Sequence, residues 1–383
     1  MHHRSWWLHG SFSEEERRVR LVWLHRHSVY TVLFVLLALA VALFGMPFPA
    51  SSPGAMTTPV PTVEPTHTPE PAPTSAPEPE ATPPPEPTPV ATLEPAPVLI
   101  PLPTLPPEPP TSANAPRVGI QAGHWITELP AELAHLETSI GAVADGYNEA
   151  MINLDVARRT AALLQSVGVT VDVLPAAIPP GYNADAFVAL HADGAEVNAR
   201  GFKVAAPWAA SAASEQLRAA LEESYAQATG MPRHAGVTAA MRGYYAFNYR
   251  RYEHSIARTT PAVIVELGFL TDSRDRAILT QETDRVALGL ANGIITYLNN
   301  YDPHDLAART PPDLGVWRAA DASLTVRSAA SDTAAPLLTV DAERPLIAFE
   351  ERDGWLRVIV AGAWDQVGWV RRDSVEPLAE AVP

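Results

Sequence analysis

The chain has 383 residues, no cysteine and a formal net charge of −16 at pH 7. This length is enough for two or three domains. Without cysteine, disulfides and thiolate zinc sites are excluded, so any zinc must be bound by histidine and carboxylate side chains. The acidic balance argues against nucleic acid as a partner.

Residues 29–48 are apolar and carry no charge. About 20 residues at ~1.5 Å per residue cover the ~30 Å hydrocarbon core of a bilayer, so this segment is predicted to be a transmembrane anchor. Four arginines lie within residues 17–26, and no lysine or arginine follows until Arg117. The positive-inside rule therefore predicts a single-pass protein of the cell membrane, with residues 1–28 cytoplasmic and the rest extracytoplasmic. A cleaved signal peptide is the alternative, but the leader is long and polar and lacks a clean cleavage site.

Residues 49–116 are predicted to form a disordered linker. Residues 47–116 hold about 25 of the 39 prolines, and such a segment cannot form a packed core. Fully extended at ~3.1 Å per residue, it would reach roughly 200 Å from the membrane. We interpret it as a spacer, because the alternative, a ligand for proline-binding domains, requires partners that are mostly cytoplasmic.

Residues 117–301 alternate between strand-like and helix-like segments. This pattern predicts an α/β domain, a mostly parallel sheet flanked by helices. The predicted strands are 118–121, 170–174, 186–190, 201–205 and 263–265, and the predicted helices are 148–167, 214–228 and 286–298. Gly168 and Gly230 are expected to end the first two helices.

Two further segments complete the chain. Residues 302–316 carry three prolines and are predicted to be a short second linker. Residues 317–378 contain five short alternating runs separated by turn residues, which predict a small antiparallel barrel. The runs are 324–327, 337–340, 346–349, 355–360 and 368–370.

Three apolar runs in the α/β domain each lead to a potential metal ligand or base. They end at His124, His191 and Glu266, and Glu149 lies at the start of the first predicted helix. Ligands of parallel sheets bind beyond the carboxyl ends of the strands, so these side chains are expected to converge. Two imidazoles with carboxylates are the composition of a hydrolytic zinc site, which predicts a metal-dependent hydrolase.

Each of these residues also has a structural interpretation. Taken singly, His124 is expected to be a hydrogen-bonded loop residue, and Glu149 a favourable charge near the positive end of a helix. His191 interrupts an apolar strand and needs a partner, since burying an unpaired imidazole is costly. Glu266 also follows an apolar strand, where a carboxylate is rarely buried without a function. Three other histidines of this domain lie in polar stretches and are predicted to be surface residues: His135, His234 and His254.

The motifs around these residues resemble those of zinc-dependent N-acetylmuramoyl-L-alanine amidases of bacterial cell walls. The matching segments are Gly-Ile-Gln-Ala-Gly-His at 119–124, Asn-Glu at 148–149, Asp-Ala-Phe-Val-Ala-Leu-His-Ala-Asp at 185–193 and Pro-Ala-Val-Ile-Val-Glu-Leu-Gly-Phe-Leu at 261–270. Asn248 lies where the family often has a similar segment. The sequence departs from the family at Trp125, where glycines are usual, and by a shortened stretch at 175–184. These departures affect the rim of the site.

The resemblance implies that His124, Glu149 and His191 bind Zn²⁺ and that Glu266 acts in catalysis. Zinc would lower the pKa of a bound water from ~15.7 to about 7, and Glu266 would take its proton and later pass it to the leaving amine. The substrate implied is peptidoglycan, cut between N-acetylmuramic acid and L-alanine of the stem peptide.

The C-terminal segment resembles bacterial SH3-like domains through Val-Arg-Ser at 326–328, Gly-Trp at 354–355 and Gly-Trp-Val at 368–370. Such a domain could also bind peptidoglycan. Two alternatives to the amidase stay open. One is a zinc peptidase that acts on another amide of the wall. The other is a membrane-anchored, wall-binding protein whose amidase-like domain is inactive.

Overall fold

The computed structural model describes residues 115–194 and 199–378, all within one compact unit. The predicted cytoplasmic segment, the anchor at 29–48 and nearly all of the first linker lie outside the described residues. Among the residues described, no helix has both the length and the apolar character needed to cross a membrane.

The sheet of the α/β domain has five strands in the order β4-β1-β5-β7-β6. Neighbours pair in parallel from β4 to β7, and β6 joins the edge antiparallel to β7. The strands are Arg117–Ala122 (β1), Thr170–Leu174 (β4), Ala186–Asp193 (β5), Lys203–Ala205 (β6) and Ala262–Phe269 (β7). The mostly parallel sheet predicted from the sequence is confirmed.

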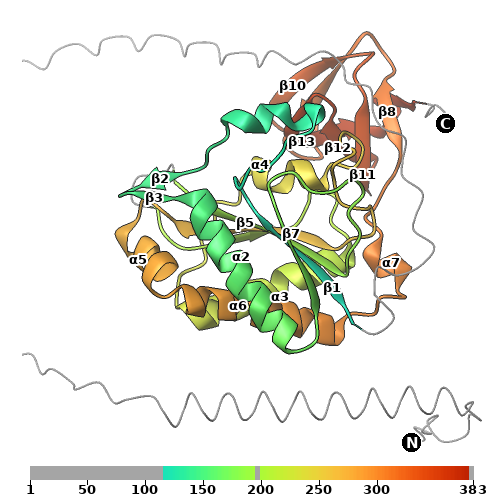
Figure 1. Ribbon diagram of the computed structural model, residues 1–383. Coiled ribbons are helices and arrows are strands. Elements are labelled where there is room, and N and C mark those ends of the chain that lie inside the picture. The colour runs from blue at the N-terminus through green and yellow to red at the C-terminus, as the bar shows by residue number, and fades with distance from the viewer. Residues whose placement is uncertain (1–114, 195–198, 379–383) are drawn as a thin grey trace, which may run out of the picture. The chain divides into compact units, whose positions relative to one another are not determined.

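Three long helices pack on one face of this sheet (Figure 1). They are Glu149–Ser166 (α2), Ala212–Thr229 (α3) and Thr283–Asn300 (α6). The side chain of Asn148 accepts a hydrogen bond from the Met151 amide and so caps the start of α2. Gly230, with a φ of 68°, ends α3 in the left-handed conformation that favours glycine. The predicted helix ends therefore fall within three residues of the observed ones.

The opposite face of the sheet is covered by short elements and loops. These are the 3-10 turns Ala131–Thr138 (η1) and Tyr245–Phe247 (η2) and the single-turn helix Ala239–Arg242 (α4). Their buried aromatic side chains form a second core with the alternate residues of β5 and β7, such as Phe187 and Ile264. The central strands are therefore buried on both faces, which explains why β5 and β7 are mostly apolar.

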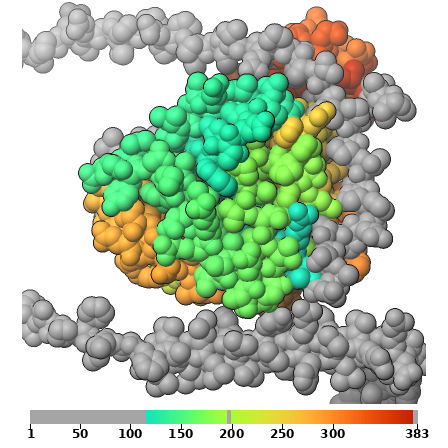
Figure 2. Space-filling view, viewed as in Figure 1, coloured from blue at the N-terminus to red at the C-terminus, as the bar shows by residue number. Residues whose placement is uncertain are grey.

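A two-stranded hairpin, Val143–Ala144 (β2) and Tyr147–Asn148 (β3), precedes α2. It lies beside the helix Ser273–Gln281 (α5), and Arg276 of α5 forms an ion pair with Asp145 of the hairpin at 3.0 Å. In Figure 2 the first half of the α/β domain, teal to green, forms most of the visible surface, and α5 in orange borders the hairpin. The hairpin was not predicted.

The C-terminal residues form one antiparallel sheet in the order β10-β9-β13-β12-β11-β8-β14. The five predicted runs correspond to Ser323–Arg327 (β9), Pro336–Asp341 (β10), Leu346–Arg352 (β11), Trp355–Val360 (β12) and Ala363–Arg371 (β13). Two strands were missed, Val316–Ala319 (β8) and Val375–Pro377 (β14), which pair antiparallel with each other. The turn Arg372–Ser374 (η3) connects β13 to β14. A C-terminal β domain is therefore present, and we refer to it as the C-terminal sheet.

The segment predicted as a second linker is folded in the structure. It contains the short helix Leu306–Arg309 (α7), and the buried Arg309 donates hydrogen bonds to the carbonyl oxygens of Thr259 and Pro303. Further on, Asp313 forms an ion pair with Arg250 at 2.9 Å. The C-terminal sheet itself contacts the α/β domain through β13 and α4.

Close packing of α3 on α6 gives a test of the fold. A Cβ atom at Gly293 would lie 2.8 Å from Cα and 2.9 Å from Cδ2 of Leu221. Alanine at a helical glycine normally stabilises by about 1 kcal/mol, whereas overpacking a core costs ~1–3 kcal/mol. We therefore expect Gly293→Ala to lower the free energy of unfolding by about 1 kcal/mol, measured by urea unfolding.

The exposed Thr296→Ala on the same helix serves as the control for helix propensity and should leave stability unchanged or slightly raised. A Gly293→Ala protein more stable than the parent would show that α3 and α6 do not approach this closely.

Candidate metal centre

β1 ends in a tight turn that carries His124. This residue has a left-handed backbone conformation, with a φ of 61°. A Cβ atom on the preceding Gly123 would lie 2.4 Å from Nε2 of His191 and 2.6 Å from the carbonyl oxygen of Leu190, so only glycine allows the approach. The turn brings the two imidazole rings edge to face, with their centroids 4.8 Å apart.

Glu149 is the first residue of α2 and is 4% exposed. Its Oε2 accepts a hydrogen bond from the Ala142 amide at 2.7 Å. Its Oε1 accepts from the Ala192 amide at 3.0 Å and from Nδ2 of Asn153 at 3.3 Å. The positive end of α2 further favours a negative charge here. The buried carboxylate is therefore fixed in place by a helix, a loop and a strand.

The carboxylate lies between the two imidazoles. Its Oε1 is 3.3 Å from Nε2 of His124 and 3.1 Å from Nδ1 of His191. One donor atom of each of the three residues lies within 4.8 Å of the others. Tetrahedral zinc with bonds of about 2.0–2.1 Å places its ligand atoms ~3.3 Å apart. The distances from Oε1 to the two imidazole nitrogens, 3.3 and 3.1 Å, agree with this spacing.

The hydrogen bond of His124 presents the correct nitrogen to this centre. Its Nδ1 lies 2.8 Å from the carbonyl oxygen of Ser139, which only accepts hydrogen bonds, so Nδ1 carries the proton. Nε2, which faces Glu149, is then unprotonated and free to act as a ligand. A second partner that fixes the tautomer in this way is characteristic of metal-binding histidines.

A side-chain network fixes His191 in the same manner. The amide of Gln121 donates from Nε2 to Tyr245 and to the carbonyl oxygen of Ala176, which leaves Oε1 to accept from the hydroxyl of Tyr244 at 3.0 Å. The Tyr244 oxygen therefore accepts the proton of His191 Nε2, at 3.3 Å. In the neutral imidazole, Nδ1 of His191, which faces Glu149, is then left with its lone pair. When the ring is protonated, Nδ1 donates a hydrogen bond to Glu149 at 3.1 Å.

The charges of this cluster support one another. Burial raises the pKa of Glu149, but the hydrogen bond and charge of His191, the charge of His124 and the amide of Ala142 outweigh it, so the pKa lies below its usual value. Burial lowers the pKa of His191, but its hydrogen bond to Glu149 and the charges of Glu266 and Glu149 raise it overall. A cluster that stabilises positive charge between these side chains is suited to a cation.

Glu266 lies beside this cluster on β7. It is the register partner of His191 on β5 and of Lys203 on β6, so the three side chains form a row across the sheet. Burial raises the pKa of Glu266 to about 7, with smaller contributions from His191 and Lys203, which lower it, and from Glu149 and Asp193, which raise it. Lys203 is 3% exposed and pairs with Asp193.

The four residues singled out from the sequence line one open cavity of about 350 Å³. His124, Glu149 and His191 form the metal-ligand cluster, and Glu266 lies next to it. Their catalytic and ligand roles stay predictions. Asn248 does not reach this cavity and lies instead near the C-terminal sheet.

Five residues that support the site were not predicted, because no sequence motif marks a residue that hydrogen-bonds to a metal ligand. They are Gln121, Ser139, Asn153, Lys203 and Tyr244. The other histidines of the domain have separate contacts. His135 stacks on Tyr252, and His254 contacts Glu132 at 2.7 Å. His234 lies beside Phe269, with ring centroids 5.0 Å apart.

Comparison with known proteins identifies the domain that carries this cluster. Residues 118–296 match the family model described as N-acetylmuramoyl-L-alanine amidase. No curated relative matches the sequence. The α/β domain is therefore similar to this amidase family over residues 118–296.

Solved amidase structures resemble about half of this chain. The CwlD amidase of Clostridioides difficile, in complex with the GerS lipoprotein, shares 17% identity over 49% of this chain and 100% of its own, with a TM-score of 0.36. Ami1 of Mycobacterium smegmatis shares 19% over 50% and 100%, also at 0.36. The catalytic domain of CwlV from Bacillus (Paenibacillus) polymyxa shares 23% over 48% and 98%, at 0.33.

Two glycines of the loop and hairpin before α2 allow a matched test of the metal centre. Gly141 has a φ of 73°, and a Cβ atom there would lie 2.7 Å from Oε2 of Glu149 and 2.9 Å from Cγ of His124. Gly146 has a φ of 81° and nothing within 4 Å of such an atom. Alanine costs about 1 kcal/mol of backbone strain at either position. We expect Gly141→Ala to weaken zinc binding by ~10–100-fold, as perturbed partners of metal ligands do.

Zinc titration with a competing chelator measures this effect independently of activity. Gly146→Ala should bind zinc like the parent. If both variants bind zinc equally well, the loop does not hold the ligands as described.

Proposed function

We propose that the protein is a zinc-dependent N-acetylmuramoyl-L-alanine amidase that hydrolyses the bond between N-acetylmuramic acid and L-alanine of the peptidoglycan stem peptide. The observation that carries this proposal is the position of one Glu149 oxygen between two imidazole nitrogens, with Glu266 in the adjacent strand register. The family match over residues 118–296 supports the choice of bond.

Three side chains are assigned as the zinc ligands: His124 through Nε2, His191 through Nδ1, and the carboxylate of Glu149. This set of two neutral nitrogens and one carboxylate leaves a position open for water or substrate. Zinc bound there would supply Lewis acidity, polarising a carbonyl group and lowering the pKa of a water molecule to about 7.

Glu266 is assigned as the general base and acid. Its carboxylate accepts a proton from the attacking water and returns it to the nitrogen of L-alanine as the amide bond breaks. A carboxylate with a pKa of about 7 exchanges a proton readily at neutral pH, which suits both steps. Lys203 pairs with Asp193 beside Glu266. Its positive charge lowers the pKa of Glu266 and so favours the ionised carboxylate.

The two alternatives are less well supported. An inactive wall-binding protein has no need for the hydrogen bonds that hold both imidazoles in the tautomer suited to a metal. A zinc peptidase would use the same side chains, but the family match favours the muramoyl amide.

We also propose that residues 29–48 anchor the protein in the cell membrane and that the catalytic domain works on the extracytoplasmic side at the end of the proline-rich linker. The C-terminal sheet is proposed to be SH3-like and to bind peptidoglycan as well. These proposals rest on the hydropathy, charge and proline content of the sequence and on its resemblance to wall-binding modules.

The roles of the four residues are separable by metal content. Glu266→Gln should keep about one zinc per chain while amidase activity falls by ~10²-fold or more, since it removes a base and not a ligand. His124→Ala and His191→Ala should lose zinc as well as activity. The exposed His304→Ala is the control and should keep both.

Metal analysis with product analysis on purified cell wall checks this prediction. The expected products are new lactyl carboxylates and free amino groups on L-alanine, and a chelator should abolish them until zinc is restored. Cleavage at another amide would favour the peptidase, and loss of zinc from Glu266→Gln would show that Glu266 is a ligand.

Membrane extraction tests the anchor. The protein should pellet with membranes and resist both high salt and alkaline carbonate, because an apolar helix of about 20 residues is released only by detergent. Release of the catalytic domain by carbonate, or a mature N-terminus between residues 47 and 60, would contradict the proposal.

A further inference from the structure

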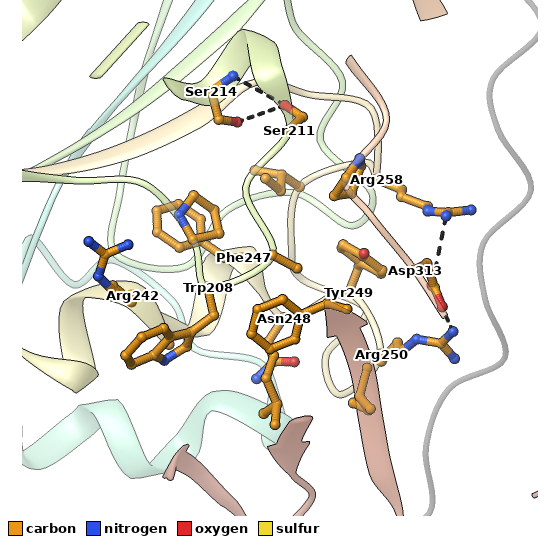
Figure 3. A pocket seen from close by; sticks show the side chains of 18 of the residues that line it. Trp208, Ser211, Ser214, Arg242, Phe247, Asn248, Tyr249, Arg250, Arg258 and Asp313 are labelled. Carbon is orange, nitrogen blue, oxygen red and sulfur yellow. Dashed lines mark hydrogen bonds and ion pairs between the residues drawn. The ribbon is translucent and has the colours of Figure 1, made fainter. Parts of the chain in front are cut away.

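A second pocket lies between the α/β domain and the C-terminal sheet (Figure 3). We call it the junction pocket; it is lined by residues 207–214, 242–260 and 311–313 and by side chains of β11, β12 and β13. Its volume is about 70 Å³. A cavity of ~10–15 Å³ holds one water molecule, so the pocket admits several waters or one carboxylate with the carbon atoms next to it.

The lining of the junction pocket is positively charged although the chain is strongly acidic. Among the described residues that line it, three are arginines, Arg242, Arg250 and Arg258, and one is acidic, Asp313. Asp313 lies 2.9 Å from Arg250 and 3.7 Å from Arg258. Figure 3 shows this group on one side of the pocket, with Trp208 and Arg242 on the other.

The third arginine of the lining, Arg242, forms no ion pair with Asp313. Within the described part of the chain, no carboxylate forms an ion pair with Arg242, which packs over the Trp208 ring at 5.3 Å. Arg357 of β12 lies over the same ring at 5.5 Å. Burial lowers the pKa of Arg242; the charge of Glu215 raises it, and the charges of Arg357 and Arg218 lower it. A bound anion would relieve this repulsion.

Two indole N–H groups point to the same kind of ligand. The Nε1 atoms of Trp208 and Trp364 are both buried, and neither has a hydrogen-bond acceptor among the described residues. Trp364 is 8% exposed, and both residues line the junction pocket. Buried N–H groups without an acceptor are rare in folded proteins, and an indole can only donate.

We propose that the junction pocket binds a peptide carboxylate, held by Arg242 and the two indole N–H groups. A carboxylate brings one negative charge, which matches Arg242, the one guanidinium of the described pocket lining for which no ion pair is found. Its two oxygens have enough lone pairs for all three donors. The rest of the lining is largely apolar, with Phe247, Ile347 and Phe349, and suits the carbon atoms next to the carboxylate.

The position of the pocket indicates which peptide it binds, an assignment that rests on the proposed amidase function. Tyr244 lines the junction pocket, and its hydroxyl contacts Nε2 of His191 at 3.3 Å. Tyr244 therefore contacts both a proposed zinc ligand and the junction pocket. A few residues of extended peptide, at ~3.3 Å each, span the length of one tyrosine side chain. The carboxylate is therefore assigned to the stem peptide that continues from the cleaved bond.

Binding to the full-length protein in detergent tests the proposal without requiring catalysis. The probes are a synthetic stem peptide that begins with L-alanine and has free carboxylates, and the same peptide with carboxamides in their place. Isothermal calorimetry should show that the parent prefers the acid by about 10-fold or more, the expected contribution of a charge-assisted hydrogen bond.

Arg242→Gln and Trp208→Phe should each lower the affinity for the acid by about 10-fold and leave that for the carboxamide unchanged. Trp208→Phe keeps an aromatic ring and removes only the N–H donor. Arg158→Gln, which removes an exposed positive charge from α2, is the matched control and should bind like the parent.

Equal affinity of the parent for acid and carboxamide would overturn the proposal. So would an unchanged preference in Arg242→Gln, or an equal loss of both peptides in the variants, which would show a packing role. The proposed function fails separately: acid-selective binding that depends on Arg242, without cleavage of the muramoyl amide, would retain the pocket and refute the amidase.

Discussion

The buried carboxylate of Glu149 is the group on which the candidate site depends. A charge in this position is costly unless hydrogen bonds and opposite charges compensate for its lost hydration. Three separate elements provide them: the loop before the hairpin through Ala142, β5 through Ala192, and α2 through Asn153 and its positive end. The same oxygen that accepts two of these bonds also faces both imidazoles. The position of this one carboxylate therefore links three elements of the fold to the geometry of the candidate metal centre.

The two faces of the sheet differ in composition and in role. Aliphatic residues and three long helices fill one face, which makes the scaffold stable. The other face carries aromatic side chains together with Gln121, His191 and Glu266, and it is covered by short turns. Its polar groups form a continuous network from Gln121 through Tyr244 to His191. The segment that provides Tyr244 also contacts the C-terminal sheet, since a Cβ atom on Gly243 would lie 2.8 Å from the Trp364 carbonyl oxygen.

Much of the fold was predictable because its signals are local. The strands are runs of consecutive apolar residues, and α2, α3 and α6 show the helical spacing of apolar residues. Asn148 and Gly230 are residue types that are typical of helix ends. The convergence of His124, His191 and Glu266 followed from the parallel topology. The strands themselves were predicted too short, since β5 and β7 continue past His191 and Glu266 to Asp193 and Phe269. The hairpin before α2 was missed because its strands have two residues each and no alternating pattern. β8 and β14 were missed because each is short and pairs only with strands distant in sequence, β8 with β11 and β14, and β14 with β8.

The supporting residues of the site were beyond prediction for a different reason. Ser139 contributes a backbone carbonyl, for which any residue type would serve. Tyr244 lies more than 50 positions from His191 and reads in sequence as one aromatic residue among several. The folded structure of residues 302–316 was also not predicted, because their prolines suggest a linker. Arg309 and Asp313 hold this segment through contacts with residues distant in sequence, which no local pattern indicates.

Lys203 gives the protein an unusual chemical property. It is the only lysine of the sequence, and the folded domain holds its amine in an ion pair beneath Phe269, beside the row that contains Glu266. Acylating reagents attack only a deprotonated, accessible amine, so the folded catalytic domain should resist them and leave the α-amino group as the reactive site. The rate at which Lys203 is modified would therefore report how often the β7–β6 edge opens, at the border of the metal centre.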